Sequence, residues 1–531
     1  MNKNDVRHFD AVVVGAGFAG MYMLHRLRGL GLRAVVLEAG GGVGGTWYWN
    51  RYPGARCDVE SMEYSYQFSD ELQQEWEWSE RYAAQPEILR YANHVADRFD
   101  LRRDIQFNAR VASMAFDGAK LQWTLTTQRE DFTARFCIMA TGCLSSPNTP
   151  DFKGVDLFQG DIYHTGLWPH EEVSFHGKRV AVVGTGSSAV QSIPLIAQQA
   201  DQLYVFQRTP NYAVPAHNHV LDPKHQQAVK AEYPALRARA KLNATGIDFD
   251  YSERLALETS HEDREREYEA RWQRGGLSFL GAFMDIMTEE EANRTASDFV
   301  RAKIRRTVRD PEVAELLAPK NTIGCKRLCI DTSYYETFNR PNVTLVDVSR
   351  SPIEISPSSV SAAGCAYKVD AIVFATGFDA MTGALAKIDI RGSNGTSLQE
   401  NWTEGPRTYL GLMTVGFPNM FTVTGPGSPS VLTNMLPTIE QHVDWIAEAV
   451  AYMRSNRISR MEPTLEAQDA WVAHGNELAG RTLRYTCGSW YLGANIPGKP
   501  RVFMPYIGGL PRYMMKCREV VDKGYEGFLL S

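Results

Sequence analysis

The chain has 531 residues, of which 44% are hydrophobic and 22% charged, and its formal net charge is -6 at pH 7. This length exceeds what one hydrophobic core usually serves, so we expect more than one domain. The small net charge excludes a broad basic surface, so we expect neither a nucleic-acid partner nor attraction to an acidic membrane.

The N-terminal residues MNKNDVRHFD are too polar for a secretory signal, and the glycine-punctuated apolar stretch 11–24 is too short to span a bilayer. We therefore expect a cytoplasmic protein. The eight cysteines are scattered, without the short paired spacings of a zinc site or a disulfide scaffold. We interpret the spacing of Cys325 and Cys329 as incidental and expect no metal site.

A strand–turn–helix–strand pattern begins near the N-terminus. A buried strand at 11–14 leads into the turn GAGFAG, a helix over 21–30 and a second strand that stops at Glu38. The glycines of this turn are Gly15, Gly17 and Gly20. They let the backbone approach a pyrophosphate at the helix N-terminus, while a carboxylate after the second strand can bind ribose hydroxyls. The pattern predicts a site for an adenine dinucleotide.

The stretch VAVVGTGSSAVQ at 180–191 repeats this device, and its next strand at 203–206 runs into Arg208 and Thr209. The second turn supplies Gly184, Gly186, Ser187 and Ser188. An arginine where the first unit has a carboxylate suits the 2′-phosphate of NADP, because a guanidinium pairs with it bidentately; the alternative is an ordinary surface arginine. The carboxylate after the first unit and the arginine after the second therefore predict FAD at the first turn and NADPH at the second.

Two buried strands end in the same triplet, ATG, at residues 140–142 and 375–377. We interpret them as the crossover points of an α/β fold with two nested Rossmann-like dinucleotide-binding domains. Charge-dense and helically periodic sequence between them predicts an all-helical insertion in the NADP domain. The expected boundaries are 1–143 and 381–531 for the FAD-binding domain, 144–220 and 321–380 for the NADP-binding domain, and 221–320 for the insertion.

Glycines and aromatic residues fill the segment GGTWYWNRYPGARCD at 44–58, which ends in Asp58. No redox-active cysteine pair follows the first unit, which argues against a disulfide reductase. Such a segment can enclose a flat ring system and present one acid beside it. We expect it to bind the flavin through Gly45, Thr46, Trp47 and Asp58.

The stretch FQGDIYHTGLWP at 158–169 matches the fingerprint F-x-G-x-x-x-H-T-x-x-W-P. By this motif the chain resembles the type I Baeyer–Villiger monooxygenases, and within them the phenylacetone monooxygenase branch. The segments KRL at 326–328 and GSWYLGANIPGKPR at 488–501 extend the resemblance over nearly the whole chain. The fingerprint residues are Phe158, Gly160, His164, Thr165, Trp168 and Pro169.

The resemblance implies an NADPH-dependent flavoprotein that inserts one oxygen atom of O2 next to a ketone carbonyl and forms an ester or lactone. Arg327 matches the arginine that lies over the flavin, where a fixed cation stabilises the flavin peroxide with the help of bound NADP+. Asp58 matches the carboxylate that pairs with this arginine. An ion pair of purely structural importance is the alternative for both residues.

Other positions carry over from the same resemblance. Lys326 falls, with Arg208 and Thr209, where the family binds the 2′-phosphate. Trp490 matches a loop tryptophan that closes over the nicotinamide cofactor; the alternative is a core aromatic. We interpret His164 as a residue that positions the NADP domain rather than as a catalytic base, and we expect its replacement to weaken domain coupling more than flavin binding.

The loop SPSVLTNM at 428–435 resembles the family loop that borders the substrate. Its expected pocket residues are Ser430, Val431, Leu432 and Met435. Their apolar character predicts a small hydrophobic ketone, whether aryl, linear or cyclic, and no obligatory protein partner is inferred. Two alternatives stay open: a flavin monooxygenase that oxygenates nitrogen or sulfur, and a non-catalytic NADPH-binding redox sensor.

Overall fold

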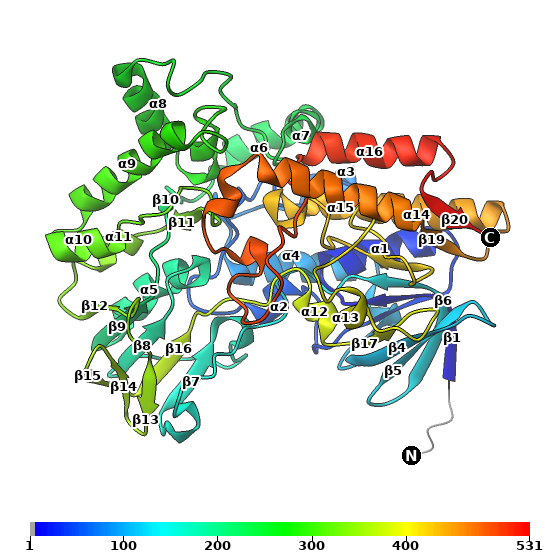
Figure 1. The fold of residues 1–531 in the computed structure, drawn as a ribbon, viewed down its shortest axis with the longest axis horizontal. Helices are drawn as coiled ribbons and strands as arrows, with labels where there is room; N and C mark the ends of the chain where they lie inside the picture. The colour runs from blue at the N-terminus through cyan, green and yellow to red at the C-terminus, as the bar shows by residue number, and fades with distance from the viewer. Residues whose placement is uncertain (1–5) are drawn as a thin grey trace.

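The computed structural model describes residues 6–531 and contains two large sheets that lie side by side (Figure 1). Residues 1–5, on which part of the argument against a signal peptide depended, lie outside the described residues. The first sheet has the order β17-β4-β5-β6-β1-β2-β3, with β18 also paired to β6. Its strands are β1 (Val6–Val14), β2 (Ala34–Leu37), β3 (Ile105–Gln106), β4 (Val111–Asp117), β5 (Gln122–Thr127), β6 (Asp131–Met139), β17 (Asp389–Arg391) and β18 (Met420–Thr422).

The second sheet is wholly parallel, in the order β12-β9-β8-β16-β7. Its strands are β7 (Asp161–His164), β8 (Arg179–Val183), β9 (Gln202–Gln207), β12 (Val343–Asp347) and β16 (Ala371–Phe374). A small antiparallel sheet of β13 (Glu354–Ser356), β14 (Ser359–Ala362) and β15 (Cys365–Lys368) lies between β12 and β16 in the chain. All strands of the second sheet fall between β6 and β17 of the first, so the predicted α/β fold with two nested units is confirmed.

Each nested unit uses its first turn glycine in the same way. Gly15 has φ +105°, and a Cβ there would lie 2.5 Å from the carbonyl oxygen of Ala140. Gly184 has φ +113°, and its Cβ would lie 2.5 Å from the carbonyl oxygen of Ala375. Both positions therefore need glycine for conformation and for space. The ATG triplets thus end the strands against which the two glycine turns pack.

The helix after each glycine turn begins immediately after the second glycine of that turn. Helix α1 (Phe18–Gly29) starts three residues before the expected Met21, because Gly17 is already its N-cap with extended backbone. Helix α5 (Ser187–Gln199) starts after Gly186 in the same manner. Neither helix has a side-chain cap, so the amides of both first turns are available to a ligand.

Between β10 (Ala213–Pro215) and β11 (Cys329–Asp331) the chain, described throughout this stretch, forms helices and no strand. The helices are α6 (Pro223–Ala231), α7 (Tyr233–Leu242), α8 (His261–Arg274), α9 (Glu290–Thr307) and α10 (Pro311–Leu317). On α8, Arg266 pairs with Glu262 at 3.0 Å and with Asp263 at 2.7 Å. The charge run is therefore a solvated helix face with local ion pairs.

Of the remaining helices, α11 packs against α5 in the second unit, and the others cover the first unit or end the chain (Figure 1). These remaining helices are α2 (Thr46–Trp49), α3 (Asp70–Glu75), α4 (Gln85–Arg98), α11 (Tyr334–Thr337), α12 (Gly383–Ala386), α13 (Leu398–Asn401), α14 (Met435–Ser455), α15 (Leu465–Gly480) and α16 (Leu510–Asp522). Strands β19 (Met461–Pro463) and β20 (Phe528–Leu530) form a separate antiparallel pair. None of the helices in residues 6–531 has the length and apolar character to cross a membrane.

The structure contains a cysteine pairing that the sequence spacing did not predict: Cys325 forms a disulfide with Cys487, 162 residues away. The sequence carries no signal for it, because neither short spacing nor a repeated pattern connects the two positions. Cys329 instead lies 3.3 Å from the hydroxyl of Ser187, so its closeness to Cys325 in sequence is incidental. Among the described residues, no cluster of His, Cys, Asp and Glu side chains is arranged to hold a metal ion.

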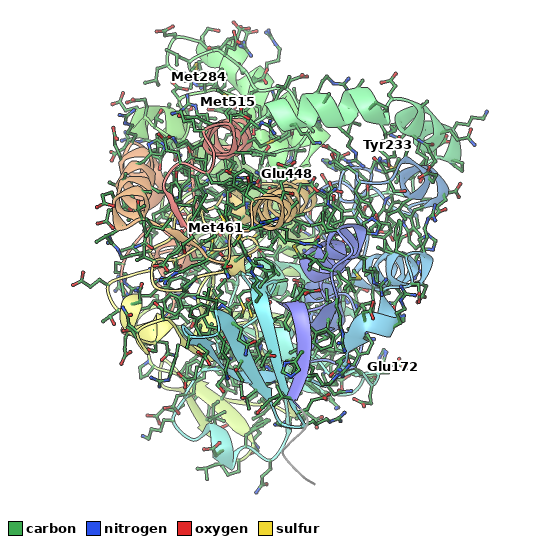
Figure 2. All side chains as sticks on the ribbon, turned by 90° about the vertical axis from the view of Figure 1, so that its right-hand side faces the viewer. Glu172, Tyr233, Met284, Glu448, Met461 and Met515 are labelled. Carbon is green, nitrogen blue, oxygen red and sulfur yellow. A yellow bond between two sulfur atoms is a disulfide. The ribbon has the colours of Figure 1, made fainter. Side chains whose placement is uncertain are left out.

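Buried charges join the helical segment to the first unit. Arg237 on α7 donates to the carbonyl oxygen of Glu63 at 3.1 Å and to Ser65 Oγ at 2.8 Å, and lies 4.5 Å over the ring of Tyr233, which Figure 2 labels. Nearby on α14, Glu440 is 7% exposed, and burial raises its pKa from 4.5 to about 7. The interior beside Arg237 thus contains a carboxyl that resists ionisation.

The raised pKa of Glu440 makes stability depend on pH. The folded state favours the protonated carboxyl, so this contribution is present below pH 4.5 and is lost as the pH rises toward about 7. Glu440→Gln cannot ionise and keeps an oxygen for the amides of Gln67 and Phe68, at 2.7 and 2.9 Å. We expect its melting temperature to exceed that of the unchanged protein by about 2 °C at pH 8 and by less at pH 5. A difference independent of pH, measured by calorimetry, would contradict this assignment.

Candidate active site

A largely buried ion pair joins the two nested units. Arg327 Nε donates to Asp58 Oδ2 at 2.7 Å, and the side chains are only 23% and 25% exposed. Arg327 Nη1 also donates to the carbonyl oxygen of Val431 at 2.6 Å. One guanidinium therefore connects the segment after the first glycine turn, the entry to β11 and the loop before α14.

This guanidinium is fixed as a cation. Burial acts to lower the pKa of Arg327, but the Asp58 carboxylate and the Tyr491 phenol outweigh it, and the pKa lies above its ordinary value. A side chain that is charged at every working pH and held by two acceptors has little freedom to reorient. The site therefore presents a permanent positive charge in one place.

Contacts between the units hold Asp58 beside Arg327. The side chain of Gln191 on α5 accepts from the Tyr52 hydroxyl at 2.8 Å and donates to the carbonyl oxygen of Arg56 at 3.1 Å. A Cβ on Gly54 would lie 2.4 Å from the carbonyl oxygen of Gln191, so the backbone approach requires glycine. The segment that ends in Asp58 is thus packed against the first helix of the second unit.

The first glycine turn is closed by the loop that follows Glu38. Gly44 N donates to the carbonyl oxygen of Ala16 at 3.0 Å, and a Cβ on Gly45 would lie 2.8 Å from Gly17 Cα. Glu38 accepts from Ala16 N at 2.6 Å and from Gly40 N at 2.7 Å, so its carboxylate ties the two loops together as well as facing the turn. The close backbones at an uncapped helix N-terminus fit a dinucleotide pyrophosphate.

Two other residues predicted to bind FAD, Gly20 and Trp47, are packed closely against the protein itself. A Cβ on Gly20 would lie 1.8 Å from the carbonyl oxygen of Gly15, which fixes the helix directly on the turn. Trp47 is 7% exposed and donates to the Tyr64 hydroxyl at 3.1 Å, whereas Thr46 is exposed. Of the aromatic loop, Thr46 and the Gly45 backbone are therefore the parts open to a ligand.

The second glycine turn opens toward two cations. No atom lies within 4 Å of a Cβ built on Gly186, and Ser187 and Ser188 begin α5. Arg208 is exposed; burial and the charge of Arg208 both lower the pKa of half-buried Lys326. Neither cation has a carboxylate partner within the described chain, so the two together suit a phosphate dianion.

Two hydroxyl contacts complete this second turn. The Ser188 hydroxyl lies 3.2 Å from that of Thr165 in the fingerprint, and Thr209 gives its carbonyl oxygen to the Thr185 hydroxyl at 2.9 Å. The side chain of Thr209 makes no such contact, so its hydroxyl can face a ligand. The fingerprint therefore lies directly beside the second turn.

His164 links the connecting segment to β16. Its Nδ1 accepts from Gly166 N at 2.9 Å, and its Nε2 lies 3.2 Å from the carbonyl oxygen of Asn148 and from Thr376 Oγ1. Burial lowers its pKa, which favours the neutral ring with Nε2 protonated. These contacts support a positioning role at the junction of the two units.

The rest of the fingerprint packs around this junction. A Cβ on Gly160 would lie 2.3 Å from the carbonyl oxygen of Asp370 and 2.7 Å from the Phe158 ring. Trp168 is 6% exposed and lies 5.2 Å from the ring of Tyr163 on β7, while Pro169 follows it at the surface of the turn. These contacts all lie within the second unit, beside β7 and β16.

The predicted substrate loop and the predicted cofactor loop meet in one apolar cluster. Val431, Leu432 and Met435 pack there with Trp490 and Tyr491, whose rings are 4.2 Å apart. Ser430 contributes no free hydroxyl, because its Oγ lies 3.4 Å from the carbonyl oxygen of Thr424. Two cavities of about 160 Å³ each, behind residues 499–506, include neither Arg327 nor Asp58 in their walls.

Sequence reasoning missed two neighbours of Arg327. Tyr491 is 1% exposed and raises the pKa of Arg327, and Arg484 lies with its Cζ 5.3 Å over the Tyr491 ring. Tyr491 follows Trp490 in a recognised segment, but no local pattern tells which neighbour faces the cation. Only the folded chain brings these positions together.

Comparisons with known proteins agree with this architecture. A family model described as pyridine nucleotide-disulphide oxidoreductase matches residues 12–269. A Baeyer–Villiger monooxygenase of Pseudooceanicola batsensis is 43% identical, over 98% of this chain and 96% of its own length. A phenazine N-monooxygenase of Lysobacter antibioticus is also 43% identical, over 100% and 98%.

Solved structures are similar over the whole chain. An oxidised steroid monooxygenase bound to NADP is 52% identical with a TM-score of 0.94, covering 98% of this chain and 99% of that one. A closed structure of cyclohexanone monooxygenase is 42% identical with a TM-score of 0.97, covering 99% and 100%. As the fingerprint predicted, the chain belongs to the Baeyer–Villiger monooxygenase family.

Proposed function

We propose that this protein is an FAD- and NADPH-dependent monooxygenase that uses O2 to convert an uncharged hydrophobic ketone into an ester or lactone. The observation that carries the proposal is the Arg327 guanidinium, held by Asp58 and the Val431 carbonyl between two dinucleotide-type turns. A preorganised cation of this kind stabilises negative charge that develops during the reaction.

We assign FAD to the first unit, residues 1–143 and 381–531. The Gly15–Gly20 turn and the amides of α1 would hold its pyrophosphate, Glu38 its ribose, and Gly45 and Thr46 would line its course toward Asp58. Bound and reduced, the flavin supplies the oxygen-activating chemistry. The support is the close backbone approach of Gly17 and Gly45, which holds the loop after Glu38 directly against the glycine turn.

We assign NADPH to residues 144–220 and 321–380, with 221–320 as a helical insertion. The amides of α5 and the Ser187 and Ser188 hydroxyls would face the pyrophosphate. Arg208, Thr209 and Lys326 would bind the 2′-phosphate, and Trp490 would cover the nicotinamide. Support comes from the two unpaired cations and from the apolar cluster that contains Trp490.

In this proposal the protein contributes a fixed positive charge and an apolar cluster that excludes water. Arg327 stabilises the oxyanion that forms when the ketone carbonyl is attacked, and Asp58 keeps the guanidinium in place without taking a proton from it. The cluster around Val431, Leu432 and Met435 offers only apolar side chains to a substrate, which favours an uncharged ketone. Relatives named for acetone, cyclohexanone and steroid oxidation are consistent with this class.

Nitrogen oxygenation is the second candidate, because one 43% identical relative is named a phenazine N-monooxygenase. The two reactions differ in the charge that the site must stabilise: a ketone attacked at its carbonyl carbon becomes an oxyanion, whereas an aromatic nitrogen attacks oxygen with its own lone pair and gains positive charge. Supplying phenylacetone and phenazine in parallel, with NADPH, separates them by product. A protein that forms no product from either would support the redox-sensor alternative.

Removing the fixed cation tests the role of Arg327. We expect Arg327→Ala to keep its fold and its FAD while ester formation falls by about 100- to 1,000-fold, because the oxyanion loses its preorganised partner. The measurements are the FAD absorbance of the purified protein and product yield by gas chromatography. Arg309→Ala, which removes an exposed arginine outside the site, is the matched control. Undiminished ester formation by Arg327→Ala would exclude Arg327 from the reaction.

The two cations beside the second turn predict a preference for NADPH. Each of Arg208→Ala and Lys326→Ala should raise KM for NADPH by about 10- to 100-fold and leave KM for NADH nearly unchanged, because only NADPH carries the 2′-phosphate. Initial rates with both coenzymes check this. Equal kcat/KM for NADH and NADPH in the unchanged protein would contradict the assignment.

A further inference from the structure

The Cys325–Cys487 disulfide joins two segments that both reach the candidate active site. Cys325 directly precedes Lys326 and Arg327, and Cys487 lies three residues before Trp490. The Cα atoms of the two cysteines are 6.1 Å apart, within the usual range for a disulfide. The bond therefore connects the entry to β11 covalently to the turn that carries Trp490 and Tyr491.

The non-covalent contacts along the same seam are few. Thr486 Oγ1 donates to Thr322 Oγ1 at 3.0 Å, but Thr486 is exposed and water competes for this bond. Arg484 Nη1 donates to the carbonyl oxygen of Gly324 at 2.7 Å, yet its Nε has no partner and burial lowers its pKa. Hydrogen bonds that are exposed to water or incomplete contribute little, so the disulfide is the main link between residues 322–325 and 484–487.

The turn is anchored differently at its other end. Asn495 Nδ2 donates to the carbonyl oxygen of Phe378 at 2.7 Å, and Lys499 Nζ pairs with Asp379 Oδ1 at 2.5 Å. Between the anchors, the buried hydroxyl of Ser489 has no hydrogen-bond partner. Residues 488–494 thus form a loop held at both ends, and breaking the disulfide leaves the downstream anchor and the packing of Trp490, Tyr491 and Leu492 in the apolar cluster.

We propose that Cys325–Cys487 is a reversible redox tie that holds the Trp490–Leu492 turn against Arg327 and thereby controls how well water is excluded from the active site. The consequence for turnover rests on the proposed function; the tie itself does not. With the disulfide formed, the turn stays docked and NADPH consumption is coupled to product. With both thiols free, the turn opens more often and reducing equivalents escape to O2 as hydrogen peroxide.

The exposure of the two sulfur atoms determines which of them a reductant attacks first. Cys325 is fully buried and Cys487 is partly exposed, so a thiolate reductant attacks Cys487 Sγ. The S–S bond breaks, and its electron pair leaves on Cys325 Sγ, which lies 3.1 Å from the amide nitrogen Nδ2 of Asn321. The second thiol of a dithiol then displaces Cys487, giving two protein thiols and one oxidised reductant.

Hydrogen peroxide reverses the change. One peroxide oxidises the two thiols to the disulfide and is itself reduced to two water molecules. Because uncoupled turnover of NADPH and O2 produces this oxidant, an opened enzyme would generate the reagent that closes it again. Where peroxide is not removed, the peroxide released by the opened enzyme would therefore re-form the Cys325–Cys487 disulfide.

The tie is tested first without turnover. In the full-length protein, non-reducing peptide mapping should find the Cys325–Cys487 peptide, and dithiothreitol should remove it. Reduction should speed amide hydrogen exchange in residues 483–494 by about tenfold and leave the strands of both sheets unchanged, since only the upstream anchor is lost. Free thiols at both positions after peroxide treatment, or exchange that does not respond to reduction, would overturn the proposal.

Cysteine variants then connect the tie to coupling. Cys487→Ser should show the faster exchange without dithiothreitol and should release at least about threefold more peroxide per NADPH oxidised. Cys365→Ser, which removes an exposed free cysteine on β15, should respond to dithiothreitol as the unchanged protein does. Unaltered peroxide release from both reduced protein and Cys487→Ser would refute control of the active site. Redox-dependent exchange in a protein that forms no ester would support the tie and contradict the proposed function.

Discussion

The arrangement of this protein depends on one buried guanidinium. A cation with three-quarters of its surface removed from water is costly unless acceptors replace the lost hydration, and Arg327 has two, Asp58 and the carbonyl of Val431. These acceptors come from segments 269 and 104 residues away. Satisfying a single side chain therefore requires that both nested units and the C-terminal loop reach their final positions together.

The nested topology makes this convergence possible. Each unit ends a parallel strand in an ATG triplet against its first turn glycine, Gly15 on Ala140 and Gly184 on Ala375. In open α/β sheets, ligands bind beyond the carboxyl ends of such strands, where the helices begin. Both dinucleotide-type turns thus open at the ends of their sheets, and Gln191 on α5 binds the segment that carries Asp58. The two units are joined at the place where chemistry would occur.

The sequence predicts those features that a local backbone demands. Glycine turns, buried strands and helix starts depend on neighbours within a few residues, so both units could be predicted from motifs. The Arg327–Asp58 pair, whose members lie 269 residues apart, was expected only from the family resemblance. The contact of Glu38 with Ala16, and the disulfide of Cys325 with Cys487, depend on how separate segments pack. No periodicity or spacing records such a partner. Even the start of α1 at Phe18 follows from the cap geometry of Gly17 rather than from apolar periodicity.

Three consecutive residues each lie against a different distant segment of the chain. Cys325 reaches the Trp490 segment, Lys326 lies near Arg208, and Arg327 holds Asp58. Because they share one stretch of backbone, a shift that improves one contact displaces the other two. The pairing of Cys329 N with the carbonyl of Tyr212, at 3.0 Å, fixes the end of this stretch at the start of β11. A disulfide cysteine, a cation beside Arg208 and the central guanidinium thus follow one another along the backbone, so their positions depend on one another.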